Sequence, residues 1–325
     1  MENLIYTNLE NASFIMLLAA IALSLYVLSK GADLFVNQAV GISVKFNIPK
    51  VIIGATIVSL GTTLPEVTVS SVAALKGNAD LAIGNAIGSI IANTALIIGV
   101  AALIGDMKID KKSVMFQFIT LFISMIVFSI MAINKVISPS MGIALLVILA
   151  IYSFITTKRG KDQASEVDDM EVNKDPFIKQ IILFIVGIAL VVLSSKVLIP
   201  TIEITALRVG IPQSVIAATL VAFGTSLPEL VTAITAARKG HPELAVGNVL
   251  GADILNILFV IGLSSIFSKT GLIVPAQFFR LDMPVMFLSV GIFFIAAINK
   301  GEKVSKLESF ILIGLYFSYL VINYI

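Results

Sequence analysis

The stretch GTSLPELV, residues 224–231, places a proline and a glutamate inside an apolar run, and nearly the same stretch, GTTLPEVT, occupies residues 61–68. The two copies lie at an offset of 163 residues. At this offset, residues 48–99 and 211–262 share 24 identities over 52 aligned positions. The chain therefore contains an internal duplication, and the duplicated block carries its most unusual polar residues.

The composition indicates a membrane protein. Hydrophobic residues make up 58% of the 325 residues, charged residues only 13%, and the mean hydropathy is +1.04. A soluble domain carries about 25% charged residues. Cysteine is absent, which excludes disulfides and thiolate metal sites. A basic cluster interleaved with aromatic residues, which would suggest a nucleic-acid partner, is absent too.

Hydropathy predicts an all-α polytopic fold with ten membrane helices. They are expected at residues 13–44, 50–75, 81–104, 114–133, 139–157, 178–207, 214–238, 243–267, 278–298 and 306–324. The first and sixth exceed the length that a bilayer requires, which predicts a strong tilt. Charged residues fill the segment 158–176, which is interpreted as a solvated linker between two five-helix halves, 1–157 and 177–325.

The basic residues predict the orientation. With the N-terminus outside, fifteen lysines and arginines fall on inner connections and five on outer ones, the five being Lys76, Lys135, Arg208, Lys269 and Arg280. Cytoplasmic loops carry the excess of Lys and Arg. We therefore expect a multi-pass protein of the cell membrane with both termini extracellular and the linker cytoplasmic.

Five spans in each half is an odd number, so the second copy must cross the membrane in the opposite sense. Such inverted-topology repeats are typical of secondary transporters, whose substrate site lies near the midplane where the repeats meet. The sequence thus predicts two inverted five-helix repeats.

Each copy of the first motif carries a glutamate well inside a predicted span. An unpaired carboxylate at that depth is costly, so Glu66 and Glu229 should face a polar interior, bind a cation or be protonated. Pro65 and Pro228 cannot donate to the carbonyls four residues earlier, so each helix should be kinked there.

The kink should free backbone carbonyls on the same face as the glutamates. Those of Thr62 and Thr225 lie one turn before Glu66 and Glu229, and the hydroxyls of Thr63 and Ser226 stand beside them. Carboxylate, carbonyl and hydroxyl form an all-oxygen set, which suits Ca²⁺ or Na⁺.

The second motif reads GNAIGSIIAN at residues 84–93 and GNVLGADILN at 247–256. Its glycines form small-xxx-small ridges, which let helices approach closely. The positions i, i+4 and i+8 form one stripe, which carries Asn85, Ser89 and Asn93 in the first copy and Asn248, Ala252 and Asn256 in the second. Those favoured for a cation site are Ser89, Asn93 and Asn256. Asn85 and Asn248 stay open between a site role and helix capping.

Together the two motifs resemble those of the sodium/calcium exchanger family, within the Ca²⁺/cation antiporter superfamily, and in particular its compact archaeal and bacterial members. The similarity covers essentially the whole chain. The resemblance implies that Glu66 and Glu229 are shared Ca²⁺ and Na⁺ ligands, with the carbonyls of Thr62 and Thr225 on Ca²⁺. Family Na⁺ positions fall on Ser59 and Ala222 (backbone carbonyls), Ser89, Ala252, Asn93 and Asn256.

The second half departs from the family pattern. Relatives commonly have serine where this chain has Ala252, and aspartate where it has Asn256. An aspartate appears instead at Asp253, where relatives often carry asparagine, and we expect it to reach the cavity because a charge facing lipid would be worse.

The resulting hypothesis is a secondary antiporter rather than an enzyme, which exchanges Ca²⁺ for Na⁺ by alternating access. Two carboxylates balance one Ca²⁺ or two monovalent ions, and the long first and sixth helices would slide over a fixed core. We expect no cofactor beyond the transported cations, and no obligatory protein partner beside the bilayer. The alternative is exchange of Ca²⁺, or another divalent cation, for H⁺, which Ala252 and Asp253 motivate.

Other functions and charged residues carry less weight. A channel is disfavoured by the inverted repeat, and an intramembrane hydrolase by the absence of HExxH and of a second histidine. His241 is interpreted as a solvated loop residue. Lys30 with Asp33, and Lys196 with Glu203, are expected to be interfacial or mutually paired.

Overall fold

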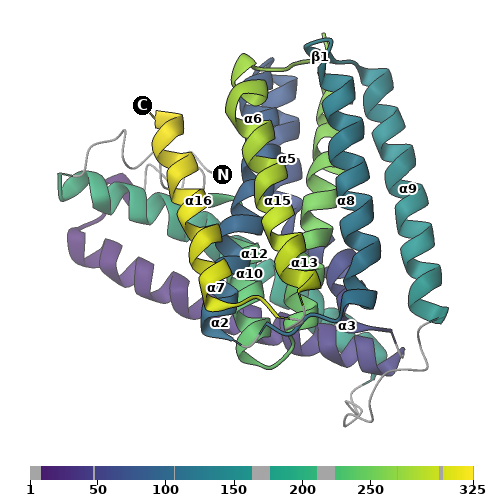
Figure 1. The fold of residues 1–325 in the computed structure, drawn as a ribbon. Helices are drawn as coiled ribbons and strands as arrows, with labels where there is room; N and C mark the ends of the chain where they lie inside the picture. The colour runs from purple at the N-terminus through teal and green to yellow at the C-terminus, as the bar shows by residue number, and fades with distance from the viewer. Residues whose placement is uncertain are drawn as a thin grey trace.

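The computed structural model describes residues 9–46, 48–105, 107–162, 176–210, 224–268, 270–299 and 303–324. It is a bundle of helices with one small two-stranded sheet (Figure 1). In the first half the elements are α2 (Phe14–Lys45), α3 (Lys50–Ile53), η1 (Gly54–Val58), α4 (Ser59–Thr62), α5 (Leu64–Leu75), α6 (Ala79–Ile91), η2 (Ala92–Ile97), α7 (Ile98–Ile104), α8 (Lys111–Ala132), β1 (Val136–Ile137) and α9 (Pro139–Asp162), the η segments being π-helical.

The described part of the second half has the same kinds of element. They are α10 (Phe177–Arg208), α12 (Leu227–Arg238), α13 (Pro242–Leu255), η4 (Asn256–Ile261), α14 (Gly262–Phe267), β2 (Leu272–Ile273), η5 (Phe278–Asp282), α15 (Met283–Ile298) and α16 (Lys306–Tyr324). Among the described residues eight helices are long and apolar enough to cross a membrane, and a ninth span results if the bent pair Lys50–Thr62 and Leu64–Leu75 counts as one. The remaining predicted span, 214–238, lies partly outside the described residues.

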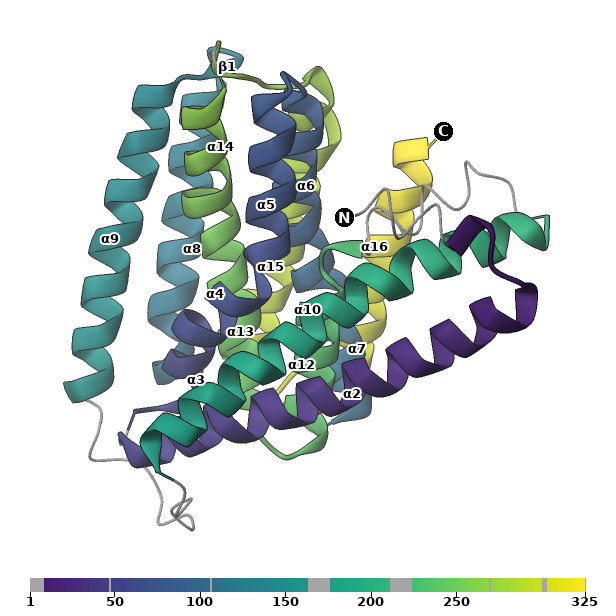
Figure 2. The same cartoon turned by 180° about the vertical axis from the view of Figure 1, so that it is seen from behind.

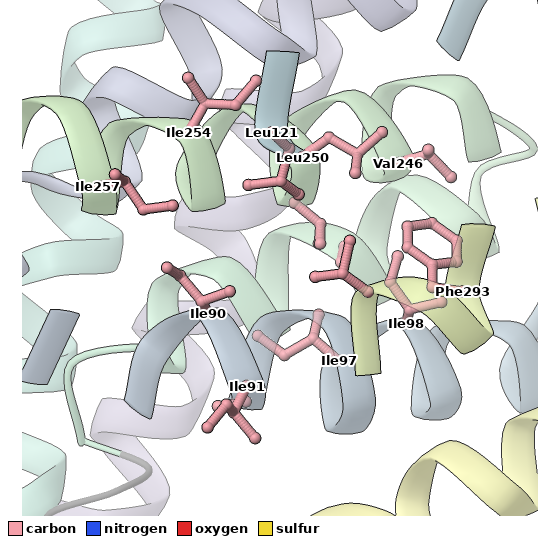
Figure 3. Close-up of a cluster of buried hydrophobic side chains, with 14 of the residues drawn as sticks. Ile90, Ile91, Ile97, Ile98, Leu121, Val246, Leu250, Ile254, Ile257 and Phe293 are labelled. Carbon is pink, nitrogen blue, oxygen red and sulfur yellow. The ribbon is translucent and has the colours of Figure 1, made fainter. Parts of the chain in front are cut away.

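Two continuous helical stretches form the centre of the bundle. In the most apolar part of Ala79–Ile104, 72% of the residues are buried, and the share for Pro242–Phe267 is 83%, whereas in the other candidate spans it is 39% or less. Figure 3 shows Ile90, Ile97 and Ile98 of α6–η2–α7 on the side that faces α13, which carries Val246, Leu250 and Ile254, and Phe293 of α15 beside Ile98. The second motif of each half therefore lies on a central helix.

The two longest helices, α2 and α10, have 32 residues each and lie side by side, obliquely across the upright helices (Figure 2). Two glycines let them touch. A Cβ at Gly31 would lie 2.8 Å from Leu190 Cβ, and one at Gly187 would lie 2.8 Å from the Phe35 amide nitrogen. The length predicted for the first and sixth helices is confirmed, and their oblique course is in line with the predicted tilt.

The repeated dipeptide Lys-Gly ends a helix in both halves. Gly77 and Gly240 each have φ of +77°, the left-handed conformation that glycine adopts without strain. The following residue donates to a carbonyl five residues back: Asn78 to Ala73 and His241 to Ala236, both at 2.9 Å. This is a Schellman motif, so the identity of the two copies here has a local conformational cause.

Two short pairings tie loops together at opposite ends of α8. At one end β1 pairs antiparallel with β2, Val136 opposite Ile273. At the other end Lys108 forms an antiparallel bridge with Lys303, so two segments predicted to lie on the inner side meet. The helices around α8 are thereby joined at both ends.

The predicted glycine ridge is confirmed in the second half but not in the first, where a Cβ at Gly84 or Gly88 would meet no atom within 4 Å. A Cβ at Gly247 would lie 2.2 Å from the Val51 carbonyl oxygen, and one at Gly251 would lie 2.6 Å from Ala55 Cα. From the other side, a Cβ at Gly54 would lie 2.6 Å from the Leu244 carbonyl oxygen. Helix α13 and the segment α3–η1, which come from different halves, thus pack backbone against backbone.

His241 and Asp33 differ from the expectation. His241 is half-buried, with Nδ1 3.2 Å from Lys50 Nζ. Burial, followed by the charges of Lys50 and Lys239, lowers the pKa of its imidazole. Asp33 pairs with Lys239 on the α12–α13 turn, at 3.1 Å, rather than with Lys30. In each case a lysine from the other half of the chain causes the difference, Lys50 for His241 and Lys239 for Asp33.

Candidate functional site

The first motif breaks its helix. Helix α4 ends at Thr62, α5 begins at Leu64, and the two stretches meet at an angle of 47°. Pro65 stands in the first turn of α5, where its missing N–H removes no hydrogen bond from that helix. The predicted kink is therefore a full break, and it places Glu66 in the first turn of a new helix.

Glu66 and Glu229 occupy matching places. Each lies in the first turn of its helix, α5 or α12, where the helix dipole favours negative charge. Each residue is only 1% exposed. Both carboxylate oxygens of Glu66, and Oε2 of Glu229, lack a hydrogen-bond partner within the described residues. Buried carboxylate oxygens without a donor fit the requirement of a cation site.

The two halves meet around these glutamates in a reciprocal way. The hydroxyls of Thr225 and Ser89 face the carboxyl of Glu66, and the hydroxyl of Thr62 faces that of Glu229. Glu229 in turn lies within electrostatic reach of Glu66. The structure thus brings together residues that are far apart in the sequence.

A pair of equivalent hydrogen bonds crosses between the halves. The Thr62 hydroxyl donates to Asn248 Oδ1 at 3.2 Å, and the Thr225 hydroxyl donates to Asn85 Oδ1 at 3.1 Å. Asn85 also donates to the Ser70 hydroxyl at 2.9 Å. Asn85 and Asn248 lie inside α6 and α13 and hold the motif threonines, so they do not cap a helix; a role in the cation site stays a prediction.

Asp253 is fully buried and is held by the first half. Its Oδ1 accepts from Asn93 Nδ2 at 3.0 Å, and its Oδ2 accepts from the Thr94 hydroxyl at 2.9 Å. Asp253 also lies near Glu229. The expectation that it faces the polar interior is in line with these contacts.

Asn93 and Asn256 stand at equivalent π-helical turns of the two halves, η2 and η4. The wider turn of a π-bulge is frequent at functional sites. Both amide oxygens are buried and lack a partner among the described residues. They can therefore serve as cation ligands.

The other candidate residues differ in their surroundings. The Ser59 carbonyl already accepts from the Thr63 amide at 2.9 Å and from the Thr62 hydroxyl at 3.3 Å. The hydroxyls of Thr63 and Ser226 are buried without a partner in the described part of the chain. Ala252 is buried in α13 and offers only its backbone. Ala222 lies outside the described residues.

Acidic side chains alone do not form the site. In the part of the chain that the structure describes, no three histidine or acidic side chains gather as a metal-binding group. A cation between Glu66 and Glu229 would therefore rely on hydroxyl, amide and backbone oxygens as well, as a hard cation accepts.

A cavity of about 250 Å³ leads toward the site from one end of the bundle. Asn85, Ser89 and Thr225 line its inner part, and other lining residues are Asp80, Leu81, Gly84, Gly88, Gln277, Asp282, Tyr316, Tyr319, Leu320 and Asn323. The equivalent residues of the second half are closed: Leu81 is 41% exposed, whereas Leu244 is fully buried. By the predicted orientation, the open end is the extracellular one.

Thr94 and Ser70 were missed by reasoning from the sequence. Both hydroxyls belong to the hydrogen-bond network, Thr94 on Asp253 and Ser70 on Asn85. A helical-wheel count from Glu66 would have found Ser70, four residues on. Nothing in the local sequence marks Thr94, because its partner comes from the other half.

Comparison with known proteins decides the family. The sequence model of the sodium/calcium exchanger protein family matches residues 16–158 and 179–325, the two segments on either side of the predicted linker. The chain belongs to this family. It is therefore a membrane protein that acts on inorganic cations as an antiporter, and its family is one of transporters rather than enzymes.

Individual relatives agree with the assignment. The sodium/calcium exchanger MaX1 of Methanosarcina acetivorans is 30% identical, over 92% of this chain and 96% of its own length. The inner membrane protein YrbG of Escherichia coli is 32% identical, over 94% and 96%. A structure of the sodium-calcium exchanger NCX_Mj soaked with Na⁺ and Sr²⁺ superposes with a TM-score of 0.81 at 29% identity, over 95% of this chain and 99% of that one.

Proposed function

We propose that this chain exchanges Ca²⁺ for Na⁺ across the cell membrane by alternating access, with Glu66 and Glu229 as shared ligands of the two cations. The observation that carries the proposal is the pair of buried carboxylates, Glu66 and Glu229: hydroxyl groups face both, and three of their four oxygens have no hydrogen-bond partner among the described residues. Two negative charges balance either one Ca²⁺ or two Na⁺. The same pocket can therefore hold either cation, and competition for it couples their fluxes.

The two halves are proposed to be inverted repeats, with both termini outside and the linker 158–176 in the cytoplasm. Matching Schellman turns, π-helical turns and crossed Thr–Asn bonds support the repeat. The orientation is supported by the bridge between Lys108 and Lys303, which brings two basic connections to one end.

The test is Ca²⁺ uptake into proteoliposomes, with Na⁺, K⁺ and H⁺ gradients imposed one at a time. Wild-type protein should take up Ca²⁺ only when the vesicles are loaded with Na⁺. Glu66→Gln and Glu229→Gln keep the side-chain shape and remove a charge, and each should abolish uptake. Glu308→Gln, at the start of α16, is the matched control and should leave uptake unchanged. Wild-type flux in either site variant would refute the assignment.

The second candidate is exchange of Ca²⁺ or another divalent cation for H⁺. Ala252 provides no hydroxyl for an outer Na⁺, and Asp253 adds a third buried carboxylate close to Glu229. Uptake driven by a pH gradient in the absence of Na⁺ would establish this function in place of the first.

A further inference from the structure

Asp253 does more than add a charge. Its two carboxylate oxygens are each bound by a donor from the first half, Asn93 Nδ2 at 3.0 Å and Thr94 Oγ1 at 2.9 Å. It is fully buried on α13, in a helix that crosses the membrane. The two donors are neighbours at the start of the π-helical turn η2.

The contact with Asp253 fixes which way the Asn93 amide points. A carboxylate only accepts hydrogen bonds when ionised, and only the NH₂ end of an asparagine donates them. The orientation of the amide therefore follows from the chemistry of its partner. Its other end, Oδ1, is turned away from Asp253, is buried, and has no partner among the described residues.

Leaving a buried carbonyl oxygen without a partner carries an unfavourable desolvation cost. That cost is removed if a cation occupies the space in front of the oxygen. On the basis of the exchange function proposed above, we infer that Asp253 is a positioning residue for cation binding. It holds the Asn93 amide so that Oδ1 faces the cation pocket, and Asn93 contacts the ion.

Only one of the two halves has an asparagine held in this way by a carboxylate at the equivalent position. At the offset of 163 residues the equivalent of Asp253 is Ile90, so no carboxylate can hold Asn256 in the same way. The Asn256 amide oxygen is likewise buried without a described partner. Asn93 thus has a carboxylate partner at a position where Asn256 has none, and it should contribute the more selective contact.

Thr94 serves the same arrangement from the other side. Its hydroxyl lies 2.9 Å from Asp253 Oδ2 and 2.8 Å from the Ile90 carbonyl oxygen, and it has a single hydrogen to give. With Asp253 ionised, that hydrogen goes to the carboxylate. Thr94→Val should therefore loosen Asp253 and weaken Na⁺ binding about threefold, less than loss of Asp253 itself.

The experiment is a double-mutant cycle between Asp253→Leu and Asn93→Ala, with Asp253→Asn as the conservative variant. Two readouts are taken: the Na⁺ concentration that gives half-maximal Ca²⁺ uptake, and the rise in unfolding temperature that NaCl or CaCl₂ produces over choline chloride. Each single change should raise half-saturating Na⁺ about tenfold, and the double variant should be no worse than Asn93→Ala alone. Asp253→Asn retains an acceptor for Asn93 and should stay within about twofold of wild type.

Three outcomes would overturn the inference. Additive effects of the two single changes would make Asp253 an independent ligand. Equal damage from Asp253→Asn and Asp253→Leu would make its charge the essential property. A lower unfolding temperature in choline, with an unchanged response to Na⁺ and Ca²⁺, would make its role purely structural.

Failure of the exchange function gives a different pattern. Wild-type protein would then show no Na⁺-driven uptake and no stabilisation by NaCl, while the response to CaCl₂ remains. The same cycle read with CaCl₂ still tests whether Asp253 acts through Asn93, and Thr94→Val replaces Asp253→Leu if the leucine variant does not fold.

Discussion

At the scale of single residues, the crossed Thr–Asn bonds are equivalent in sequence but differ in their surroundings. Thr62 and Asn248 are fully buried, whereas Thr225 and Asn85 are half-buried and line the cavity. Water can replace a lost hydrogen bond at the cavity but not in the closed half.

We therefore predict that Thr62→Val is more harmful than Thr225→Val. Valine keeps the shape and the backbone carbonyl of threonine and removes only the hydroxyl. Thr62→Val should raise the half-saturating Ca²⁺ concentration about tenfold, and Thr225→Val about threefold at most. Concentration-dependent Ca²⁺ uptake measures both, and equal effects of the two changes would contradict the role of burial.

His241 predicts a pH dependence of stability. Burial and the nearby Lys50 and Lys239 lower the pKa of its imidazole in the folded protein below the ordinary value of about 6.5. Between these two pKa values the unfolded chain binds more protons, so stability falls as the pH drops below about 6.5 and is regained above it.

The matching variant is His241→Gln, whose amide oxygen can accept from Lys50 and does not titrate. The unfolding temperature of wild-type protein, compared with that of the variant, should drop further between about pH 6.5 and pH 5. Parallel curves for the two proteins over this range would contradict the prediction.

At the scale of elements, the contact between α13 and α3–η1 has no room for a methyl group. Gly247→Ala would place a Cβ 2.2 Å from the Val51 carbonyl oxygen, and both partners there are backbone atoms that cannot turn aside. Overpacking of this kind costs about 1–3 kcal/mol or more. We predict a clear fall in unfolding temperature and in yield of folded protein.

The matched control for that change is Gly291→Ala in α15. A Cβ at this position meets no atom within 4 Å, so the substitution should leave stability unchanged or raise it slightly through helix propensity. Fluorescence-detected size-exclusion after heating compares the two variants directly. A Gly247→Ala protein as stable as the control would show that the two elements can separate without cost.

Much of the arrangement of helices can be predicted from the sequence alone. Hydropathy places helix ends within a few residues, as for Phe14–Lys45 against the expected 13–44. The proline motif predicts a disturbed helix, because a missing N–H has a local effect. The complete break at Thr63, and the π-helical turns at Asn93 and Asn256, depend on packing between the halves and could not be read from local patterns.

The candidate site likewise contains residues that the sequence predicts and residues that only the structure reveals. Glu66 and Glu229 stand out because a carboxylate in an apolar run needs a reason. The pairing of Asp253 with Asn93 and Thr94 joins residues of different halves, so only the three-dimensional arrangement reveals it. Likewise Asp33 was expected to be interfacial or to pair with Lys30 in its own helix, whereas the structure pairs it with Lys239 of the other half.

At the scale of the whole molecule, the cavity at one end of the bundle suggests which helices must move to open the site to the other side of the membrane. The central helices are joined at both ends of α8, by β1 with β2 and by Lys108 with Lys303. Helices α2 and α10 pack tightly on each other through Gly31 and Gly187, and lie obliquely across the rest (Figure 2). They are the natural unit to slide as one body over the core.

The ion pair of Asp33 with Lys239 joins this unit to the core at the closed end. At the offset of 163 residues its equivalents are Lys196 and Lys76, which repel each other. The attractive pair of Asp33 with Lys239 thus stabilises the state seen here. In the opposite state the equivalent contact would bring Lys196 and Lys76 together, and their like charges would oppose that state. A half-exposed pair contributes about 0.2–1 kcal/mol, so its loss should shift the balance up to about fivefold.

The chain offers a direct measurement, because it contains no native cysteine. Single cysteines at Leu81, on the open cavity, and at the equivalent Leu244, which is fully buried, report access from the two sides to a membrane-impermeant thiol reagent. Asp33→Asn should speed labelling at position 244 by about two- to fivefold and slow it at position 81. Exchanging the charges, Asp33→Lys with Lys239→Asp, should restore both rates; if Asp33→Asn leaves them unchanged, the pair does not hold the inner side closed.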